Sequence, residues 1–403
     1  MRNRPFPRIG VSVLAAVLAL GACGTRSEET GATTTLKIGF DAPTTGQLSA
    51  VGLGMQHSAE MAVKEANAKN LVPGVKFELV PKDDQATPSI GQQNASAFVA
   101  DQDVVGVVGA YNSSVSQSMQ PTTASANLLQ ISGANTNPTL TRGAKHKDAP
   151  KRPYKNYFRT VTTDAKEAPA VARYAYNELK LKEVATVNDG KVYGLGVIEE
   201  FTHEFEKLGG KIVVKQQISD KDTDYSAVVS NIKSSSAQAL MYGGEYPQAG
   251  PLAKQLKAAG KDIPLLGNDA VYDDEFIALA GDAAEGAYVV TAAEPIGNSQ
   301  VQQKFVTDYK AASHKEPYGI FGPYVYDATM AIINSVAAVA KAGDGKLPEK
   351  PELRAKVTEA AQNVAFDGLT GKIAFDEFGD NKNYSVTMNT VKDGKWSVVG
   401  PVG

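Results

Sequence analysis

The sequence predicts an α/β protein with two doubly wound lobes, each built on a parallel sheet. Two observations carry this prediction. Short apolar runs of strand length alternate with longer segments whose apolar residues recur at helical spacing. This alternation occurs twice, once on each side of a charged segment, Lys145–Pro153. Such alternation is typical of parallel sheets with helices on both faces.

The first series of elements lies before the charged segment. Its expected strands are 36–40, 77–80, 104–108 and 129–132, and its expected helices are 54–68, 86–100 and one that begins after Ser114. Glycine, proline, asparagine or aspartate residues follow the strands, as expected of turns.

The second series follows the charged segment, after a strand-like lead at 157–161. Its expected strands are 183–187, 211–218, 239–242, 265–267 and 286–291, and its helices are one that ends near 208, 225–234 and 248–259. The tail adds helices 301–312 and 324–342 and a hairpin-like segment, 371–396. We expect the two lobes to share this tail, so the predicted architecture is a pair of Rossmann-like lobes.

The stretch Val104–Gln117 (VVGVVGAYNSSVSQ) is the centre of the first series. A buried strand is expected to end near Gly109, and Asn112, Ser113 and Ser114 then suit the start of a helix, because asparagine and serine are favoured N-cap residues. Free N–H groups and the helix dipole make such a place a seat for an anion. An ordinary turn with a serine cap and no ligand is the alternative.

Residues 1–22 have the pattern of a lipoprotein signal peptide. A start with three arginines precedes an apolar run, Ile9–Leu20, that is too short to span a bilayer. Small residues then lead to Cys23, in a pattern that resembles the bacterial lipobox, where the thiol of the cleaved chain carries a diacylglyceryl group. An accidental cysteine behind a plain signal peptide is the alternative.

Residues 23–35 are small and polar, and they predict a flexible tether. Cys23 is the single cysteine of the chain, so no internal disulfide or thiolate metal cluster can form. The net charge is −3 and no basic cluster follows the signal peptide, which argues against nucleic acid as a partner. The segment Lys145–Pro153 predicts a solvated surface loop in preference to a binding patch.

Motifs for catalysis are weak in this sequence. The chain has four scattered histidines without the spacing of a metal site or a catalytic triad, namely His57, His146, His203 and His314. No G-x-S-x-G motif is present, and Gly52-Leu53-Gly54 begins like a dinucleotide fingerprint but lacks the third glycine. We therefore expect no enzyme activity, no cofactor and no metal, with an exported hydrolase as the alternative.

Polar residues directly after the predicted strands are the candidate ligand contacts, because doubly wound sheets bind ligands at the carboxyl ends of their strands. They are Asp83, Ser113, Ser114, Ala134, Thr136, Tyr193, Glu245 and Asp269.

Several strings together resemble the leucine/isoleucine/valine-binding proteins, which are type I solute-binding proteins of ABC importers. The similarity covers nearly all of 36–403. It rests on Lys37–Gly39 with Gly46, Asp83-Asp84, Val107–Gln117, Pro138–Thr141, Phe158–Thr160, Asp189 with Tyr193-Gly194, Tyr242–Gly244, Gly267, Ala284–Gly286 and Phe375-Asp376.

By position, the resemblance implies a site for an amino acid. Ser113 would donate its hydroxyl and a nearby backbone N–H to the ligand carboxylate. The backbone of Ala134 and the hydroxyl of Thr136 would hold the α-carboxylate and α-ammonium from the same lobe. Tyr193 would close over the ligand from the other lobe, where Asp269 would pair with the ammonium.

The side-chain end of the implied pocket departs from the family pattern. Phe321 falls where the family has a lining aromatic, but Val51 replaces a large aromatic and Glu245 replaces a tyrosine. Asp269 is one methylene shorter than the usual glutamate. These departures leave the ligand open between a larger or more polar amino acid, a cationic one, and an amide such as urea.

The resemblance also implies a hinge of three crossovers, near 158–161, 290–293 and 366–371. Lobe 1 would then comprise 36–159 and 292–366, and lobe 2 would comprise 160–291 and 367–403. The closed protein, anchored outside the cytoplasm through lipid on Cys23, would deliver its solute to an ABC permease and ATPase. A receptor that senses amino acids or amides is the alternative.

Overall fold

The computed structural model describes residues 33–292 and 296–402. The expected signal peptide, Cys23 and most of the expected tether lie outside the described residues. The tether was expected to extend to residue 35, but Thr34 and Thr35 already belong to the first strand, in register with Val75 and Lys76. The tether prediction therefore ends two residues too late, because this parallel pairing begins before the apolar run.

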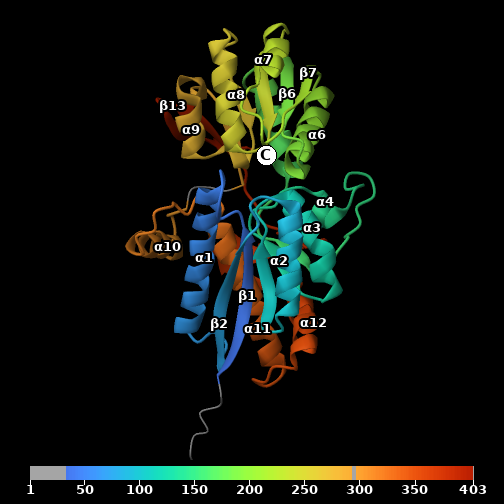
Figure 1. Cartoon of the computed structure of the whole chain (residues 1–403), viewed down its shortest axis with the longest axis vertical. Coiled ribbons are helices and arrows are strands. Elements are labelled where there is room, and N and C mark those ends of the chain that lie inside the picture. The colour runs from blue at the N-terminus through green and yellow to red at the C-terminus, as the bar shows by residue number, and fades with distance from the viewer. Residues whose placement is uncertain (1–32, 293–295, 403) are drawn as a thin grey trace, which may run out of the picture. The chain divides into compact units, whose positions relative to one another are not determined.

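Lobe 1 contains a five-stranded parallel sheet in the order β2-β1-β3-β4-β5 (Figure 1). Its strands are β1 (Thr34–Ala42), β2 (Val75–Asp83), β3 (Val104–Gly109), β4 (Leu129–Ser132) and β5 (Tyr157–Arg159). Its helices are α1 (Ser49–Ala68), α2 (Pro88–Ala100), α3 (Ser113–Ser125), α4 (Thr139–Arg142), α10 (Gln300–Ala311), α11 (Gly322–Ala342) and α12 (Lys350–Ala361).

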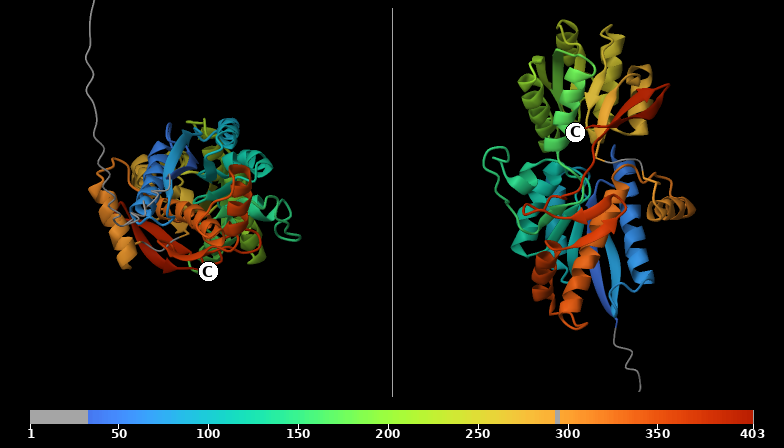
Figure 2. Two further views of the ribbon diagram at one scale, coloured as in Figure 1. Left: turned by 90° about the horizontal axis from the view of Figure 1, so that it is seen from below. Right: turned by 180° about the vertical axis from the view of Figure 1, so that it is seen from behind.

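Lobe 2 contains a seven-stranded sheet in the order β14-β13-β10-β9-β8-β6-β7. Its parallel strands are β6 (Glu183–Asn188), β7 (Lys211–Gln217), β8 (Ala239–Gly243), β9 (Leu265–Gly267) and β10 (Tyr288–Thr291). The tail adds β13 (Thr387–Lys392) and β14 (Lys395–Pro401) as an antiparallel edge, drawn in red in Figure 2.

The helices of lobe 2 connect its parallel strands. They are α5 (Asp164–Asn177), α6 (Val192–Lys207), α7 (Ser226–Lys233), α8 (Tyr246–Ala258) and α9 (Asp274–Ala280), with the short 3₁₀ helices η1 (Asp269–Val271) and η2 (Gly281–Ala284). The two-lobe α/β fold predicted from the sequence is therefore confirmed.

The central strand β3 is buried along its whole length, as its sequence VVGVVG predicts. Gly106 permits close packing of α11 on the sheet, since a Cβ at this position would lie 2.9 Å from Cγ2 of Ile332. Strand β3 is hydrogen-bonded to β1 on one side and to β4 on the other. This buried strand fixes the position at which α3 begins, which is where the candidate site lies.

The chain passes between the two sheets three times. The first two passages lie between β5 and α5 and between β10 and α10. The third was expected at 366–371, but there β11 (Ala365–Gly368) and β12 (Gly371–Ala374) form a separate antiparallel pair. The expected crossover and the single hairpin-like segment at 371–396 are therefore both wrong.

The reason for this difference is a buried aspartate on α11. Asp327 accepts hydrogen bonds from the backbone N–H groups of Leu369 and Thr370, each at 2.8 Å. These bonds tie the turn between β11 and β12 to lobe 1. The third passage lies between Asn381, which donates to the backbone of Thr160, and the start of β13. Lobe 2 therefore takes the tail only from that strand onward.

The charged segment Lys145–Pro153, here called the bridging loop, does more than face solvent. Nε2 of His146 lies 2.7 Å from Oε1 of Glu200 on α6, and both side chains are buried. Nζ of Lys147 lies 3.1 Å from Oε1 of Glu199 on the same helix. A loop that leaves lobe 1 after α4 thus contacts a helix of lobe 2.

Across residues 33–292 and 296–402, none of the helices combines the length and the apolar character that crossing a membrane would require.

Candidate functional site

A small cavity lies where the carboxyl ends of strands from both sheets face each other. It is lined by Tyr111, Asn112, Ser113, Ala134, Tyr193, Glu245, Asp269, Ala270 and Phe321. Six of the seven ligand-binding residues predicted from the sequence are among these. The seventh, Thr136, is buried two residues after Ala134 but does not line the cavity. The structure therefore brings together residues that are up to 208 positions apart, from Ser113 to Phe321.

The cavity has a volume of about 10 Å³. About 10–15 Å³ is the least that holds one water molecule, whereas pockets for small ligands enclose about 300–1,000 Å³. Binding of a solute in this cavity therefore requires the lining residues of the two lobes to move apart.

The lobe 1 side of the cavity is the N-terminus of α3. Asn112, one of the expected N-cap candidates, is the N-cap residue, but its side chain does not make the expected capping hydrogen bond. Its amide instead donates from Nδ2 to Oε1 of Glu245 at 2.6 Å. The first N–H groups of a helix have no acceptor within it, and they carry the positive end of its dipole. Together with the buried hydroxyl of Ser113, they suit an anion.

The lobe 2 side of the cavity presents a buried carboxylate. Oδ1 of Asp269 accepts from the hydroxyl of Tyr193 at 2.9 Å and from the backbone N–H of Ala270 at 2.8 Å. Its Oδ2 is buried and has no hydrogen-bond partner. Burial raises the pKa of Asp269 to about 7, although the bonds from Tyr193 and Ala270 act in the opposite direction. A cation at Oδ2 would satisfy this oxygen.

Two further acids, which the sequence analysis does not identify, lie in the first turn of α5. Asp164 and Glu167 are fully buried, and none of their four carboxyl oxygens has a hydrogen-bond partner. Burial raises the pKa of both groups well above the usual range, and the charge of Asp269 raises them further. Near neutral pH these shifts favour the protonated, uncharged form of both acids.

Glu245 connects this cavity to a neighbouring one. Its Oε2 lies 2.8 Å from Nζ of Lys191, a residue that the sequence analysis does not single out. Glu245 and Lys191 also line a second cavity of about 270 Å³, together with Gln47, Asp220 and Gln248. The side chain of Glu245 therefore stands between the small cavity and a larger polar one.

Thr136 belongs to a loop that a buried arginine holds in place. Arg159 has no exposed side-chain surface, and its guanidinium donates to the backbone carbonyls of Asn135 at 2.7 Å and Asn137 at 3.0 Å. Its Nε lies 2.8 Å from Oδ1 of Asp380. Burial alone would raise the pKa of Asp380, but the charge of Arg159 and neighbouring bonds hold it below its ordinary value. The hydroxyl of Thr136 has no hydrogen-bond partner, which leaves it available to a ligand if the cavity opens.

The apolar part of the cavity wall is aromatic. The rings of Tyr111 and Phe321 meet edge to face, with centroids 5.4 Å apart. Phe321 precedes the first residue of α11, so its position depends on the packing of that helix on β3 and β4. Val51, on α1, is partly buried and packs against the hydrophobic core.

Direct contacts join the two lobes around the cavity. Nδ2 of Asn137 donates to the backbone carbonyl of Val192 at 2.7 Å, and the hydroxyl of Tyr246 donates to the carbonyl of Gln47 at 2.9 Å. With the bond between Asn112 and Glu245, these contacts show the lobes in close apposition on both sides of the cavity.

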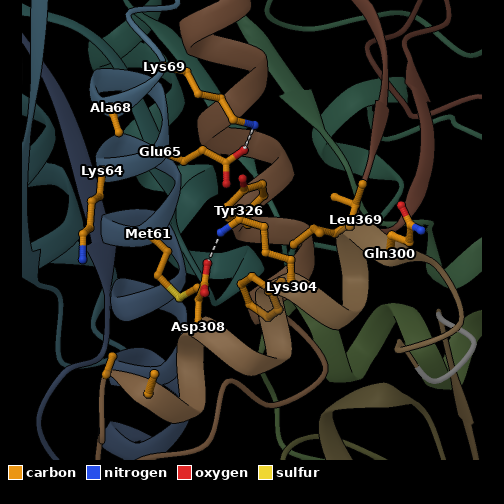
Figure 3. A pocket seen from close by; sticks show the side chains of 14 residues that line it. Met61, Lys64, Glu65, Ala68, Lys69, Gln300, Lys304, Asp308, Tyr326 and Leu369 are labelled. Carbon is orange, nitrogen blue, oxygen red and sulfur yellow. Dashed lines mark hydrogen bonds and ion pairs between the residues drawn. The ribbon is translucent and has the colours of Figure 1, made fainter.

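A larger cavity, of about 710 Å³, lies elsewhere on lobe 1, between α1, α10 and the turn after β11 (Figure 3). Four of its charged side chains form pairs: Lys69 with Glu65 at 2.7 Å, and Lys304 with Asp308. No buried polar atom lacks a partner among its lining residues. The small cavity, by contrast, is lined by two residues with a buried oxygen that has no partner, Oδ1 of Asn112 and Oδ2 of Asp269, so we place the candidate site there.

The raised pKa of Asp269 predicts how stability depends on pH. An acid whose pKa rises from 3.8 to about 7 on folding binds more protons in the folded state between those values. The free energy of unfolding should therefore fall as the pH rises from about 4 to about 7, by up to about 4 kcal/mol from this group. Urea unfolding at pH 5 and pH 8 measures the difference, and Asp269→Asn should reduce it. An equal difference in the variant would contradict the assignment.

The two-lobed architecture is that of a solute-binding protein, and comparison with known proteins shows the family. The chain belongs to the periplasmic binding protein family, whose model matches residues 35–395. This confirms the resemblance predicted from the sequence.

Two curated relatives cover most of the chain. The leucine-, isoleucine-, valine-, threonine- and alanine-binding protein of Pseudomonas aeruginosa is 32% identical over 355 residues, which are 88% of this chain and 89% of the relative. The Leu/Ile/Val-binding protein BraC3 of Rhizobium johnstonii is 30% identical over 362 residues, which are 89% of this chain and 92% of the relative.

Solved structures agree with these relatives. The leucine-binding protein LivK of Thermotoga maritima has a TM-score of 0.80 and 27% identity, and the match covers 91% of this chain and 99% of that one. LivJ of Streptococcus pneumoniae, solved in complex with isoleucine, has a TM-score of 0.77 and 25% identity, covering 91% and 100%. A benzoate complex of a solute-binding protein from R. palustris, with 21% identity and a TM-score of 0.76, shows the fold alone.

Proposed function

We propose that this protein is the extracytoplasmic solute-binding component of an ABC importer and that it binds an amino acid between its lobes. One observation carries the proposal. The N-terminus of α3 with Ser113 lines the same cavity as Asp269, so an anion seat on lobe 1 lies opposite an acid on lobe 2. An α-amino acid is a zwitterion and complements both ends.

The proposed mechanism is a clamp that closes on its solute. The carboxylate first accepts bonds from the N-terminal amides of α3 and from Ser113, with Ala134 and Thr136 beside them. The ammonium then bonds to Oδ2 of Asp269, while the ring of Tyr193 covers the ligand. Closure is favoured because only the closed arrangement makes both sets of contacts. Charge-assisted bonds of this kind contribute about 1.5–3 kcal/mol each.

The relatives support this solute class. LivK is named for leucine, LivJ contains isoleucine, and the Pseudomonas relative is named for five small or branched amino acids. A permease and an ATPase would take up the solute from the closed form. The proposed role is binding and delivery, without catalysis.

A direct test is calorimetry and thermal shift of the unliganded protein with the twenty amino acids, urea and short amides. Binding to the folded state raises the melting temperature. We expect at least one amino acid to bind with a dissociation constant of about 1 mM or lower, and urea and simple amides to bind more weakly, because they lack a carboxylate. Binding of amides alone, or of no compound, would overturn the proposal.

Ser113→Ala should weaken binding of that amino acid by about tenfold or more, equivalent to about 1.4 kcal/mol. The substitution removes a buried hydroxyl at the anion seat but leaves the backbone of α3 intact. Ser125→Ala, at the exposed end of the same helix, is the matched control and should bind normally. Calorimetry that finds no loss in the Ser113 variant would remove this residue from the site.

Cys23→Ser should release the protein from membranes, because the proposed lipid anchor needs the thiol. Fractionation of cells that express each form, with detection in the membrane and soluble fractions, measures the change. Ser27→Ala, four residues further along the tether, is the control and should stay with the membrane. Continued membrane association of the Cys23 variant would rule out lipidation at this position.

A further inference from the structure

The cavity has a second polar end, formed by Asn112 from lobe 1 and Glu245 from lobe 2. Asn112 is 4% exposed and Glu245 2% exposed. Because the Nδ2 group of Asn112 must face the carboxylate to which it donates, its Oδ1 faces away from that carboxylate. That oxygen is buried and has no hydrogen-bond partner.

The second cavity repeats this pattern. Nε2 of Gln248 donates to Oε1 of Gln47 at 3.1 Å and to the backbone carbonyl of Asp220 at 3.2 Å, which fixes the orientation of the amide. Oε1 of Gln248 is then left buried without a partner. Unpaired acceptors thus lie on both sides of Glu245, which lines both cavities.

The charges at this end exclude an acidic side chain. Lys191 is the cation that faces Glu245, but Asp220 lies 3.5 Å from the same ammonium. Burial, followed by the charge of Glu245, raises the pKa of Asp189 to about 7. The carboxyl groups around Lys191 therefore outnumber it, and another negative charge would be repelled.

We propose that the ligand is an amino acid whose side chain ends in an N–H donor and carries no negative charge. This inference rests on the proposed function and specifies its solute. The donor bonds to Oδ1 of Asn112, and the negative charge of Glu245 favours a donor at this end of the cavity. An aliphatic side chain leaves the Asn112 oxygen unpaired, and an unpaired buried acceptor costs about 1–3 kcal/mol. The second cavity gives longer side chains room beyond Glu245.

Matched ligand pairs test this proposal by calorimetry on the full-length mature protein. Asparagine and leucine are nearly equal in shape, glutamine and glutamate differ in the terminal group, and lysine and norleucine differ in the terminal ammonium. We expect the nitrogen-bearing member of at least one pair to bind about tenfold or more tightly than its partner. The neutral and cationic pairs separate an amide ligand from a basic one.

A variant separates this effect from general tightness of binding. The double substitution Lys191→Met with Glu245→Met removes both members of the ion pair, which avoids leaving one buried charge alone. In this variant the preference for the nitrogen-bearing ligand should fall about tenfold, while leucine should bind at least as well as before. Asn112→Leu should also reduce the preference for the nitrogen-bearing ligand. This variant replaces the double variant in the test if the double variant does not fold.

The outcomes are distinct. If leucine, isoleucine or valine binds as tightly as every nitrogen-bearing ligand, the inference is wrong but the proposed function stands. If glutamate binds best, the charge argument is wrong. If no amino acid binds, the proposed function fails, and this inference fails with it.

Discussion

Asp269→Asn should weaken binding of the amino acid by at least about a hundredfold. The variant keeps the shape and the bonds to Tyr193 and Ala270, but it removes the negative charge that faces the ligand ammonium. Loss of one member of a buried, hydrogen-bonded charge pair costs about 2–5 kcal/mol, because the other charge is left unpaired. Calorimetry with the best ligand of the wild-type protein measures the change.

Asp282→Asn is the matched control for this substitution. Asp282 is an exposed aspartate of the same lobe, in the short helix η2, so its replacement should leave affinity unchanged. The Asp269 variant should also unfold at a higher urea concentration without ligand, because it no longer buries an ionisable group. Unchanged affinity in a folded Asp269 variant would show that no ammonium is recognised there.

Arg159→Leu should lower the free energy of unfolding by about 3–5 kcal/mol, the usual cost of breaking a buried ion pair. The substitution leaves Asp380 buried beside fewer positive charges, and it removes the donors to the carbonyls of Asn135 and Asn137. The loop that carries Thr136 should loosen as a result, so affinity should fall as well. Urea unfolding followed by circular dichroism measures the first effect.

Arg173→Leu provides the comparison. Arg173 pairs with Glu204 at 3.2 Å on the surface of lobe 2, where such pairs contribute about 0–1 kcal/mol. Arg159→Lys should recover little of the loss, because an ammonium cannot reproduce the planar set of donors. If both arginine-to-leucine variants lost similar stability, Arg159 would not hold the loop as described.

Strands bounded by glycine or polar residues were predictable from the sequence. Leu129–Ser132 and Leu265–Gly267 form strands with the expected limits. In both, a short apolar run is followed directly by residues typical of a turn. Glycines inside helices misled the analysis instead. The first helix begins at Ser49, not Gly54, and Gly52 serves close packing, since a Cβ there would lie 2.0 Å from the carbonyl oxygen of Pro43.

Four α-helices in the described part of the chain have no counterpart in the sequence prediction, namely the short helices α4 and α9 and the longer helices α5 and α12. Helix α5 contains Pro169 and begins with a polar turn, and α12 has few buried residues, so apolar spacing is a weak signal in both. The register of the tail also depends on Asp327, a single buried acceptor that binds a turn 42 residues away. Contacts at such separations are set by tertiary packing and leave no local pattern.

Most of the residues predicted to surround the ligand follow predicted strands or lie in strings that match the family, and Phe321 was named from its position in the resemblance, which is why they could be named without a structure. The sequence indicated Asn112 as a possible N-cap residue but not as a ligand contact, and it gave no sign of a role for Lys191. The acids Asp164 and Glu167 belong to a helix that was not predicted, and their burial could not be inferred from two charged side chains at a helix start.

The bridging loop has a consequence for the balance between the open and closed arrangements of the lobes. His146 and Lys147 contact α6 but do not line the small cavity, so part of the attraction between the lobes does not depend on a bound solute. The closed arrangement is therefore stabilised by two contributions, one from the contacts of a bound solute and one from the contacts of the bridging loop. Substitutions in the bridging loop should therefore change the fraction of unliganded protein that has its lobes closed.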